Sequence, residues 1–280
     1  MFNEVKVAAI SLKPKKFDLA GNADQLEDMF RAAAAGGAAL ALAPEGVLEG
    51  YVVMEFIEGR EDSARMREVA VTMRGPVIGR FRALARQLKI ALAFGCAERI
   101  GDDVYNCALF IDAQGRIRGK YHKMQLAEGY HPSWWYNRLG KASRAFNTPF
   151  GRAGFLICND RWNPDIARIP VLDGAQILLI PSFGSRSKQQ DEAVLARARE
   201  NGVPIVEANV GVRLIISKGE ILAVERRLTG ITYGTIEVPA AVGSANRNVH
   251  EKEFLRWRQK EMKARYKRQM ERIKTKENGA

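Results

Sequence analysis

Apolar and polar positions along the chain follow two spacings, which together predict a mixed α/β protein. Short apolar runs such as VKVAAI (residues 5–10) are typical of buried strands, whereas apolar residues at every third or fourth position, as in residues 22–35, are typical of helices. We predict strands at residues 5–10, 38–43, 90–97, 104–111, 116–122, 153–158, 176–181, 204–208, 212–217, 220–226 and 231–238. Helices are predicted at residues 22–35, 63–88 with a break near Gly75 and Pro76, 164–173 and 188–201.

Short turns join these elements into one domain. Residues 90–97, 104–111 and 116–122 are separated only by tight turns, which favours three antiparallel neighbours. No linker rich in Pro, Gly or Ser divides the chain, and no internal repeat is visible. Many strands with few helices indicate two sheets packed together with helices outside. We therefore predict a single domain over residues 1–245, followed by a basic helical tail over residues 246–280.

Composition and charge narrow the class of protein. Hydrophobic residues make up 46% of the 280 residues and charged residues 27%, which is typical of a globular chain. No apolar run is long enough for a membrane span, and the first residues lack the pattern of a secretory signal, so we expect a cytoplasmic protein. The formal net charge is +12, but residues 251–277 alone carry +6. The remaining charge is spread too thinly to predict nucleic-acid binding.

The tail has two interpretations. Its apolar residues fall near one helical stripe, which suits docking on a neighbouring subunit or on the domain itself. These residues are Phe254, Trp257, Met262, Tyr266 and Met270. The alternative is contact with a nucleic acid or another acidic surface. Acidic residues interspersed in the tail weaken that alternative, so we favour packing between subunits.

Cysteine and histidine usage gives no sign of a disulfide framework or a metal site. The three cysteines are Cys96, Cys107 and Cys158, an odd number without paired spacing. Only three histidines are present and no C-x-x-C motif occurs, so neither a structural zinc nor another cofactor is expected. Any cysteine chemistry is therefore expected to be that of a reduced thiol.

Three chemically capable side chains follow the ends of predicted strands. Glu45 follows residues 38–43, Lys123 follows residues 116–122, and Cys158 ends residues 153–158. Taken alone, Glu45 and Lys123 could be ordinary surface charges, and Cys158 could be a small buried thiol without a chemical role. Jointly they form a consistent acyl-transfer set, because a desolvated carboxylate can accept the thiol proton and an ammonium can stabilise an oxyanion.

The sequence around these residues resembles the nitrilase superfamily, the carbon–nitrogen hydrolases. The resemblance covers residues 4–238 and includes LALAPEGVLEGY at Glu45, GRIRGKYHKMQL at Lys123 and GRAGFLICNDRWNPDIAR at Cys158. It implies a four-layer α-β-β-α sandwich and homodimers or larger homo-oligomers. It also implies that Glu45 is the general base, Lys123 the oxyanion stabiliser and Cys158 the nucleophile. The backbone N–H of Asn159 would complete the oxyanion site.

The resemblance further implies a small-molecule amide or N-carbamoyl substrate, because Asp160 stands where nitrilases commonly carry Glu. A second glutamate is frequent in the family between the lysine and the cysteine, where this chain has only Glu128. Candidate substrate contacts are Tyr51, Trp162 and Arg161, although the two aromatic residues are equally consistent with core positions. Arg138 and Arg186 are further candidates for pairing with a substrate carboxylate. The alternative function is a catalytically inactive binding or scaffold protein that uses its basic tail for partners.

Overall fold

The protein consists of two packed sheets with helices on both outer faces. The computed structural model describes residues 3–241 and 247–278. The first sheet has the strand order β12-β1-β2-β3-β4-β5 and the second β11-β10-β9-β8-β7-β6. The first sheet comprises β1 (Asn3–Ser11), β2 (Leu40–Leu42), β3 (Ala91–Ile100), β4 (Asp103–Ile111), β5 (Ile117–His122) and β12 (Gly230–Val238). The second comprises β6 (Phe146–Thr148), β7 (Gly151–Phe155), β8 (Ile177–Ser182), β9 (Ile205–Asn209), β10 (Val212–Ser217) and β11 (Glu220–Glu225).

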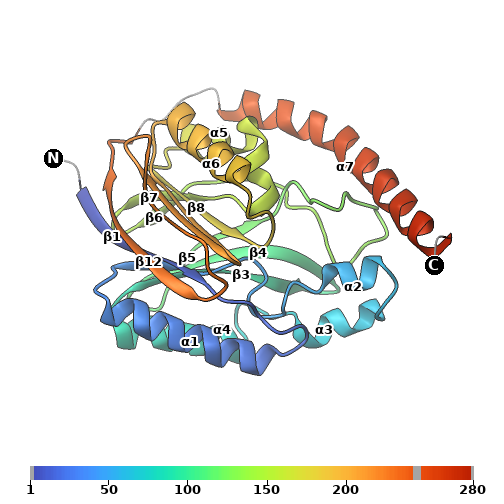
Figure 1. The fold of residues 1–280 in the computed structure, drawn as a ribbon, viewed down its shortest axis with the longest axis horizontal. Coiled ribbons are helices and arrows are strands. Elements are labelled where there is room, and N and C mark those ends of the chain that lie inside the picture. Colours follow the sequence, from blue (N-terminus) through green and yellow to red (C-terminus); the bar gives the residue numbers. More distant parts are fainter. Residues whose placement is uncertain (1–2, 242–246, 279–280) are drawn as a thin grey trace.

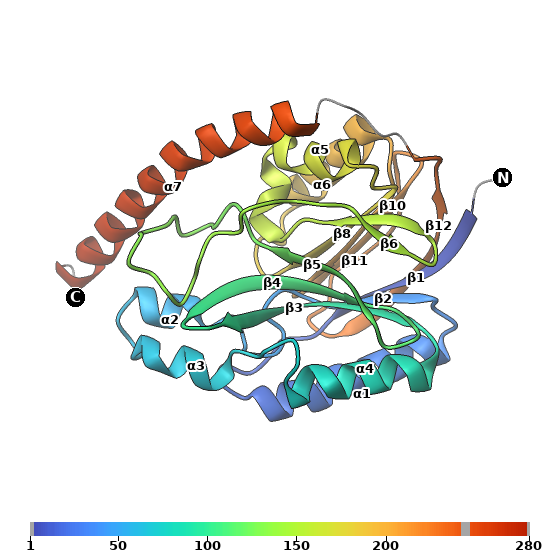
Figure 2. The same ribbon diagram turned by 180° about the vertical axis from the view of Figure 1, so that it is seen from behind.

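Helices complete the four layers that the resemblance implies. α1 (Leu19–Ala35) and α4 (Pro76–Leu88) cover the first sheet, while α5 (Pro164–Leu172) and α6 (Lys188–Asn201) cover the second (Figures 1 and 2). One apolar core lies between the sheets and extends under α5 and α6, and a second lies between the first sheet and α1 and α4. The predicted four-layer sandwich is therefore confirmed.

Each sheet is parallel at its centre and antiparallel at its edges. β1, β2 and β3 run parallel, as do β7, β8 and β9. The predicted antiparallel neighbours β3, β4 and β5 are confirmed by their register. Since crossover helices return the chain in one direction, the carboxyl ends of the central strands meet at one end of the sandwich.

The predicted helix at residues 63–88, with its break near Gly75 and Pro76, is helical at residues 63–69 and 76–88 but wrong at residues 70–75. The structure has a 3-10 turn η1 (Ser63–Arg65), a short α3 (Met66–Val69) and then an extended segment before α4. Val71 forms a bridge with Glu98 at the end of β3, which requires extended backbone there. Pro76 then begins α4, a position that tolerates its missing N–H. The pattern also missed β6 and α2 (Val53–Ile57), both very short.

The tail forms one long helix, α7 (Arg247–Asn278), which docks on its own chain (Figure 1). Phe254 joins the core between the layers, and Tyr266 packs against Trp134. The ion pairs of Arg247 with Asp173 and of Arg144 with Glu251 fasten the first turns. The apolar stripe of the tail is predicted to dock on a neighbouring subunit or on the domain itself. In this structure it docks on the domain. The predicted boundary between residues 245 and 246 lies outside the described residues.

Within the described residues, no helix combines the length and apolar character needed to cross a membrane.

Candidate active site

Glu45 lies in the loop after β2, and three donors hold its carboxylate. Lys123 Nζ donates to Oε1 at 2.6 Å and Asn106 Nδ2 to the same oxygen at 2.7 Å. The backbone N–H of Phe183, which directly follows β8 of the second sheet, donates to Oε2 at 2.9 Å. The side chain is fully buried, so these contacts fix the carboxylate in an environment that strengthens electrostatic interactions.

Lys123 directly follows β5 and is also fully buried. Its backbone N–H donates to the carbonyl of Asn106 at 2.8 Å, which anchors the strand end. Desolvation acts to lower the pKa of Lys123, but the charges of Glu45, Cys158 and Glu128 outweigh it and raise that pKa above its ordinary value. The amine is therefore a permanent cation at neutral pH.

Cys158 begins the 3-10 helix η2 (Cys158–Trp162) just beyond β7, with a positive φ of 44°. Its side chain is buried, and burial together with the charge of Glu45 raises the pKa of the thiol to about 11, although Arg161 and Lys123 act to lower it. Gly184 lies alongside, and a side chain there would come within 3.0 Å of the sulfur. The structure thus brings Glu45, Lys123 and Cys158 into one buried cluster.

Asp160 ties the loop that carries Cys158 to the loop that carries Lys123. Its Oδ2 accepts hydrogen bonds from the Ile157 N–H at 2.9 Å and the Tyr121 hydroxyl at 2.8 Å. Its Oδ1 accepts one from the Gln125 N–H at 3.2 Å. Burial raises the pKa of Asp160 to about 6. Asp160, which the sequence analysis relates to substrate class, therefore also holds these two loops together.

Glu128 and Tyr51 lie beside the cluster. Glu128 is buried and accepts a hydrogen bond from Asn137 Nδ2 at 3.2 Å. Burial raises the pKa of Glu128, while the charge of Lys123 acts to lower it, which places the two groups within electrostatic reach. The Tyr51 ring stacks on Phe183 with 5.0 Å between centroids, and Lys123 Nζ lies 6.0 Å from its centre.

The remaining candidate contacts divide between the cluster and the surface. Arg161 is buried against Glu207 and Ser182, and its Nη2 lies 3.9 Å from Cys158 Sγ. Asn159 follows Cys158 in η2, and its side chain donates to the Gln125 carbonyl at 3.2 Å. Trp162 is 39% exposed and lies over the Arg161 guanidinium.

The two other arginines proposed for a substrate carboxylate have protein partners. Arg138 donates to Asp103 at 2.7 Å, and Arg186 donates to the Val210 carbonyl at 3.0 Å.

Sequence reasoning missed three polar residues of this region. Asn106 orients Glu45, Glu207 neutralises Arg161, and Glu49 accepts a hydrogen bond from the Ala97 N–H at 2.9 Å. Asn106 lies beside the apolar part of β4, and Glu207 interrupts the fully buried strand β9. A polar residue within or next to an apolar strand run is the signal that identifies such positions.

A small cavity adjoins these groups. Its lining includes Glu49, Tyr51, Asn106 and Asn137, and its volume of about 10 Å³ is near that of one water molecule. Asn106 Oδ1 is buried without a hydrogen-bond partner among the described residues. The lining is thus polar next to the Glu45 carboxylate.

Comparison with known proteins decides the family. The family model described as carbon-nitrogen hydrolase matches residues 6–241, most of the chain. The chain belongs to the carbon–nitrogen hydrolase family. This confirms the predicted membership of the nitrilase superfamily.

Relatives of this carbon–nitrogen hydrolase include curated amidohydrolases. It is 30% identical over 217 residues to a citrullinase from Francisella tularensis, which covers 73% of each chain. It is 31% identical over 239 residues to an N-carbamoylputrescine amidase from Arabidopsis thaliana, covering 81% of this chain and 76% of the relative. An amidase from Nesterenkonia sp. AN1, solved with acrylamide, has a TM-score of 0.70 at 21% identity, covering 85% of this chain and 91% of the amidase. That likeness concerns the fold.

Proposed function

We propose that this carbon–nitrogen hydrolase cleaves the C–N bond of a small amide or N-carbamoyl compound through a thioester on Cys158. The observation that carries the proposal is the buried cluster itself, in which Lys123 Nζ lies 2.6 Å from Glu45 Oε1 and both charges act on the Cys158 thiol. A carboxylate, an ammonium and a thiol held in low dielectric are the groups that acyl transfer requires.

In the proposed cycle, Glu45 accepts the thiol proton as the sulfur attacks the carbonyl carbon. The Lys123 ammonium and the Asn159 N–H stabilise the resulting oxyanion, and the Arg161 guanidinium, 3.9 Å from the sulfur, favours the thiolate. Glu45 then returns the proton to the leaving nitrogen, the C–N bond breaks and a thioester remains. Glu45 next accepts a proton from water, which attacks the thioester, and the acid leaves as Cys158 regains its proton.

Both substrate classes have support. The curated relatives named citrullinase and N-carbamoylputrescine amidase favour an N-carbamoyl compound, and Asp160, where nitrilases commonly carry Glu, favours an amide over a nitrile. A panel of amides and N-carbamoyl amines is therefore the substrate screen.

The test is ammonia or amine release from that panel by the wild-type protein and by two variants. Cys158→Ala is expected to abolish turnover. Lys123→Ala is expected to keep the fold and to lower kcat by about 100- to 1000-fold, because one oxyanion donor is lost. Circular dichroism controls for folding, since the substitution removes the counter-ion of buried Glu45. Near-normal turnover by Lys123→Ala would refute the assigned roles, and an inert wild-type protein would favour a binding function.

A further inference from the structure

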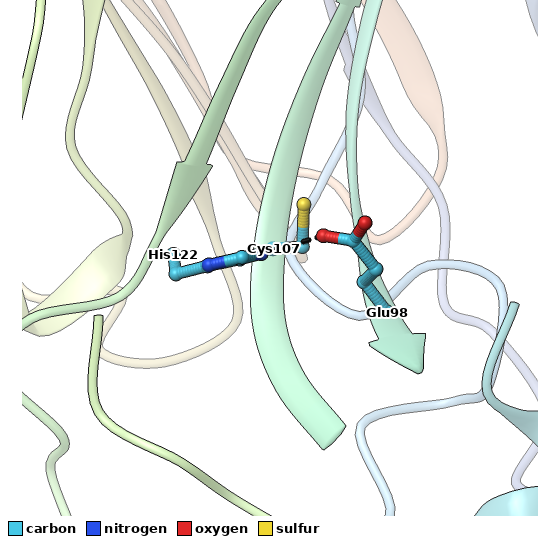
Figure 3. A group of neighbouring side chains, drawn as sticks. All are labelled: Glu98, Cys107 and His122. Atoms are coloured by element: carbon cyan, nitrogen blue, oxygen red, sulfur yellow. Dashed lines mark hydrogen bonds and ion pairs between the residues drawn. The ribbon is translucent and has the colours of Figure 1, made fainter. Parts of the chain in front are cut away.

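A second cluster of chemically capable side chains lies on the outer face of the first sheet. Glu98 on β3, Cys107 on β4 and His122 on β5 bring one ligand atom each to within 4.8 Å of one another. Figure 3 shows the His122 ring and the Glu98 carboxylate pointing from both sides toward the strand that carries Cys107. The proposed hydrolysis uses none of the three.

Strand register explains why these residues meet. Cys107 lies directly opposite His122 on one neighbouring strand and opposite Cys96 on the other. Glu98 follows Cys96 by two positions and therefore shares its face of the sheet. Three hydrogen-bonded strands thus hold the donors, which makes the arrangement more precise than one built on loops.

The closest polar contacts within the cluster join Glu98 to His122 and Lys120. Glu98 Oε2 lies 2.5 Å from His122 Nε2, and Glu98 Oε1 accepts from Lys120 Nζ at 2.7 Å. The Tyr105 ring stacks on His122 with 4.3 Å between centroids, which orients the imidazole. The Cys107 thiol makes a long contact of 3.5 Å to the neighbouring carbonyl of Ala108 and also interacts with the Cys96 thiol opposite it. Glu98 therefore provides a hydrogen-bond partner for His122 and for Lys120, and these contacts do not involve Cys107.

We propose that Glu98, Cys107 and His122 bind one divalent transition-metal ion, with Zn²⁺ the best match. Thiolate, imidazole and carboxylate are the three ligand types that zinc accepts together, whereas calcium and magnesium select oxygen. The opposed thiol of Cys96 or a water molecule supplies the fourth ligand.

Metal binding requires small, local adjustments. Tetrahedral zinc places such donors about 3.3–3.6 Å apart, so the Glu98–His122 pair opens by about 1 Å. Cys107 releases its thiol proton, and the Lys120 ammonium moves from Glu98 into solvent. The side chains of Lys120 and His122 are 34% and 19% exposed, whereas Glu98 and Cys107 are buried. The ion therefore enters the cluster past Lys120 and His122.

Binding, rather than turnover, is the appropriate readout. Cys107 and His122 are next to Asn106 and Lys123, and both of these hold Glu45. Substitutions in the cluster can therefore alter activity without any metal. The experiment uses the full-length Cys158→Ala protein, which removes the thiol of the proposed active site, kept reduced with a non-chelating phosphine.

Co²⁺ is the probe, because cobalt bound to a thiolate gives a charge-transfer absorption in the near ultraviolet. We expect this band to saturate at one equivalent and to disappear on addition of Zn²⁺. In the Cys158→Ala background, the further substitution Cys107→Ser should abolish the band. The further substitution His122→Asn retains the Cys107 thiol and should weaken Co²⁺ binding by about tenfold or more. His250→Asn, on α7, is the matched control and should bind as its parent does.

Two results would overturn the proposal. One is the absence of the charge-transfer band in the folded Cys158→Ala protein at saturating Co²⁺. The other is a band that persists unchanged in Cys107→Ser, which would locate the metal elsewhere. Should Cys107→Ser fail to fold, equal affinities for the His122→Asn and His250→Asn proteins would have the same meaning.

Discussion

Cys158 has backbone geometry that L-residues rarely adopt. Its φ of 44° lies in the left-handed region, which costs about 1–2 kcal/mol for a residue with a Cβ. The Asp160 carboxylate accepts the Ile157 N–H within the same turn and so helps to hold this conformation. Backbone strain at Cys158, whose thiol lies near the cations of Lys123 and Arg161, is consistent with its proposed role as the nucleophile.

The first prediction concerns the reactivity of that thiol. Because burial raises the pKa of Cys158 to about 11, the thiolate fraction should rise throughout pH 7–10. We expect the rate of alkylation by iodoacetamide to increase about tenfold per pH unit without a plateau. Peptide mass spectrometry measures the rate, with Cys158→Ser as the control. A plateau below pH 8 would show an activated thiolate, and a plateau by about pH 9.5 would show an ordinary thiol.

Selectivity is part of the same expectation. Cys96 and Cys107 are buried within the sheet, and burial raises the pKa of Cys107 well above its ordinary value. Labelling should therefore occur at Cys158 first. Equal labelling of all three cysteines in the folded protein would contradict it.

Glu49 gives a prediction about stability. Burial raises its pKa to about 7, so between pH 4.5 and 7 the folded state holds a proton that the unfolded state has lost. The stability contributed by protonated Glu49 is therefore lost as the pH rises through this range. Glu49→Gln keeps an acceptor for the Ala97 N–H without the charge, and we expect it to be more stable than wild type at pH 8 by up to about 3 kcal/mol.

Urea unfolding at pH 8 and at pH 4.5 measures this difference, which should shrink at the lower pH. Glu220→Gln, at an exposed position on β11, is the control and should show little change at either pH. A Glu49→Gln protein that is less stable than wild type at pH 8 would contradict the assignment.

At the scale of elements, α7 supports the loop that carries Glu128. The Tyr130 N–H donates to the Met262 carbonyl at 3.1 Å, and Arg258 donates to the Gly140 carbonyl at 2.6 Å. Gly129, between Glu128 and Tyr130, has a φ of 83°, and a Cβ there would lie 2.1 Å from the Tyr266 backbone nitrogen. The helix and the loop therefore meet backbone to backbone.

Gly129→Ala should displace α7 from this loop. We expect it to lower the free energy of unfolding by about 1–3 kcal/mol more than Gly59→Ala does, because overpacking is added to the cost of a positive φ. Gly59 is the matched control, since its φ is 67° and a Cβ there meets nothing within 4 Å. Urea denaturation gives the two energies, and limited proteolysis reports release of α7. Equal effects of the two substitutions would show that the contact is unimportant.

At the scale of the whole molecule, the cluster around Cys158 is assembled from both sheets. Glu45 and Lys123 follow strands of the first sheet, whereas Cys158 and Phe183 follow strands of the second. The hydrogen bond from the Phe183 N–H to Glu45 crosses between them. Packing of the two sheets therefore determines the geometry of the proposed active site.

Homo-oligomerisation stays a prediction at this scale. The described residues leave Leu222, Val224 and Leu228 exposed on or just after β11, an edge strand of the second sheet. Exposed apolar side chains at a sheet edge favour association with another chain. Sedimentation velocity should show a species of at least twice the protomer mass of 31.2 kDa. A single species at the protomer mass across micromolar concentrations would contradict the prediction.

Local patterns and family motifs predicted the strands and the three central residues of the candidate site. Runs such as VKVAAI need only their own apolar residues to indicate β1, and Glu45, Lys123 and Cys158 stand at strand ends within recognisable motifs. The failure at residues 70–75 has a tertiary cause, since Val71 pairs with Glu98, which lies far along the chain. The local spacing of apolar residues contains no information about such a distant partner.

The amino-acid sequence by itself therefore determined most element types, the α/β class and the order of the proposed catalytic groups, because each depends on neighbouring residues. Tertiary structure alone decided that Asn106 holds Glu45, that α7 covers its own domain, and that Cys107 faces His122. These depend on strand register and on packing between distant segments. A one-residue change of register would turn the same side chains to the opposite face, and nothing in the linear spacing records which alignment folding selects.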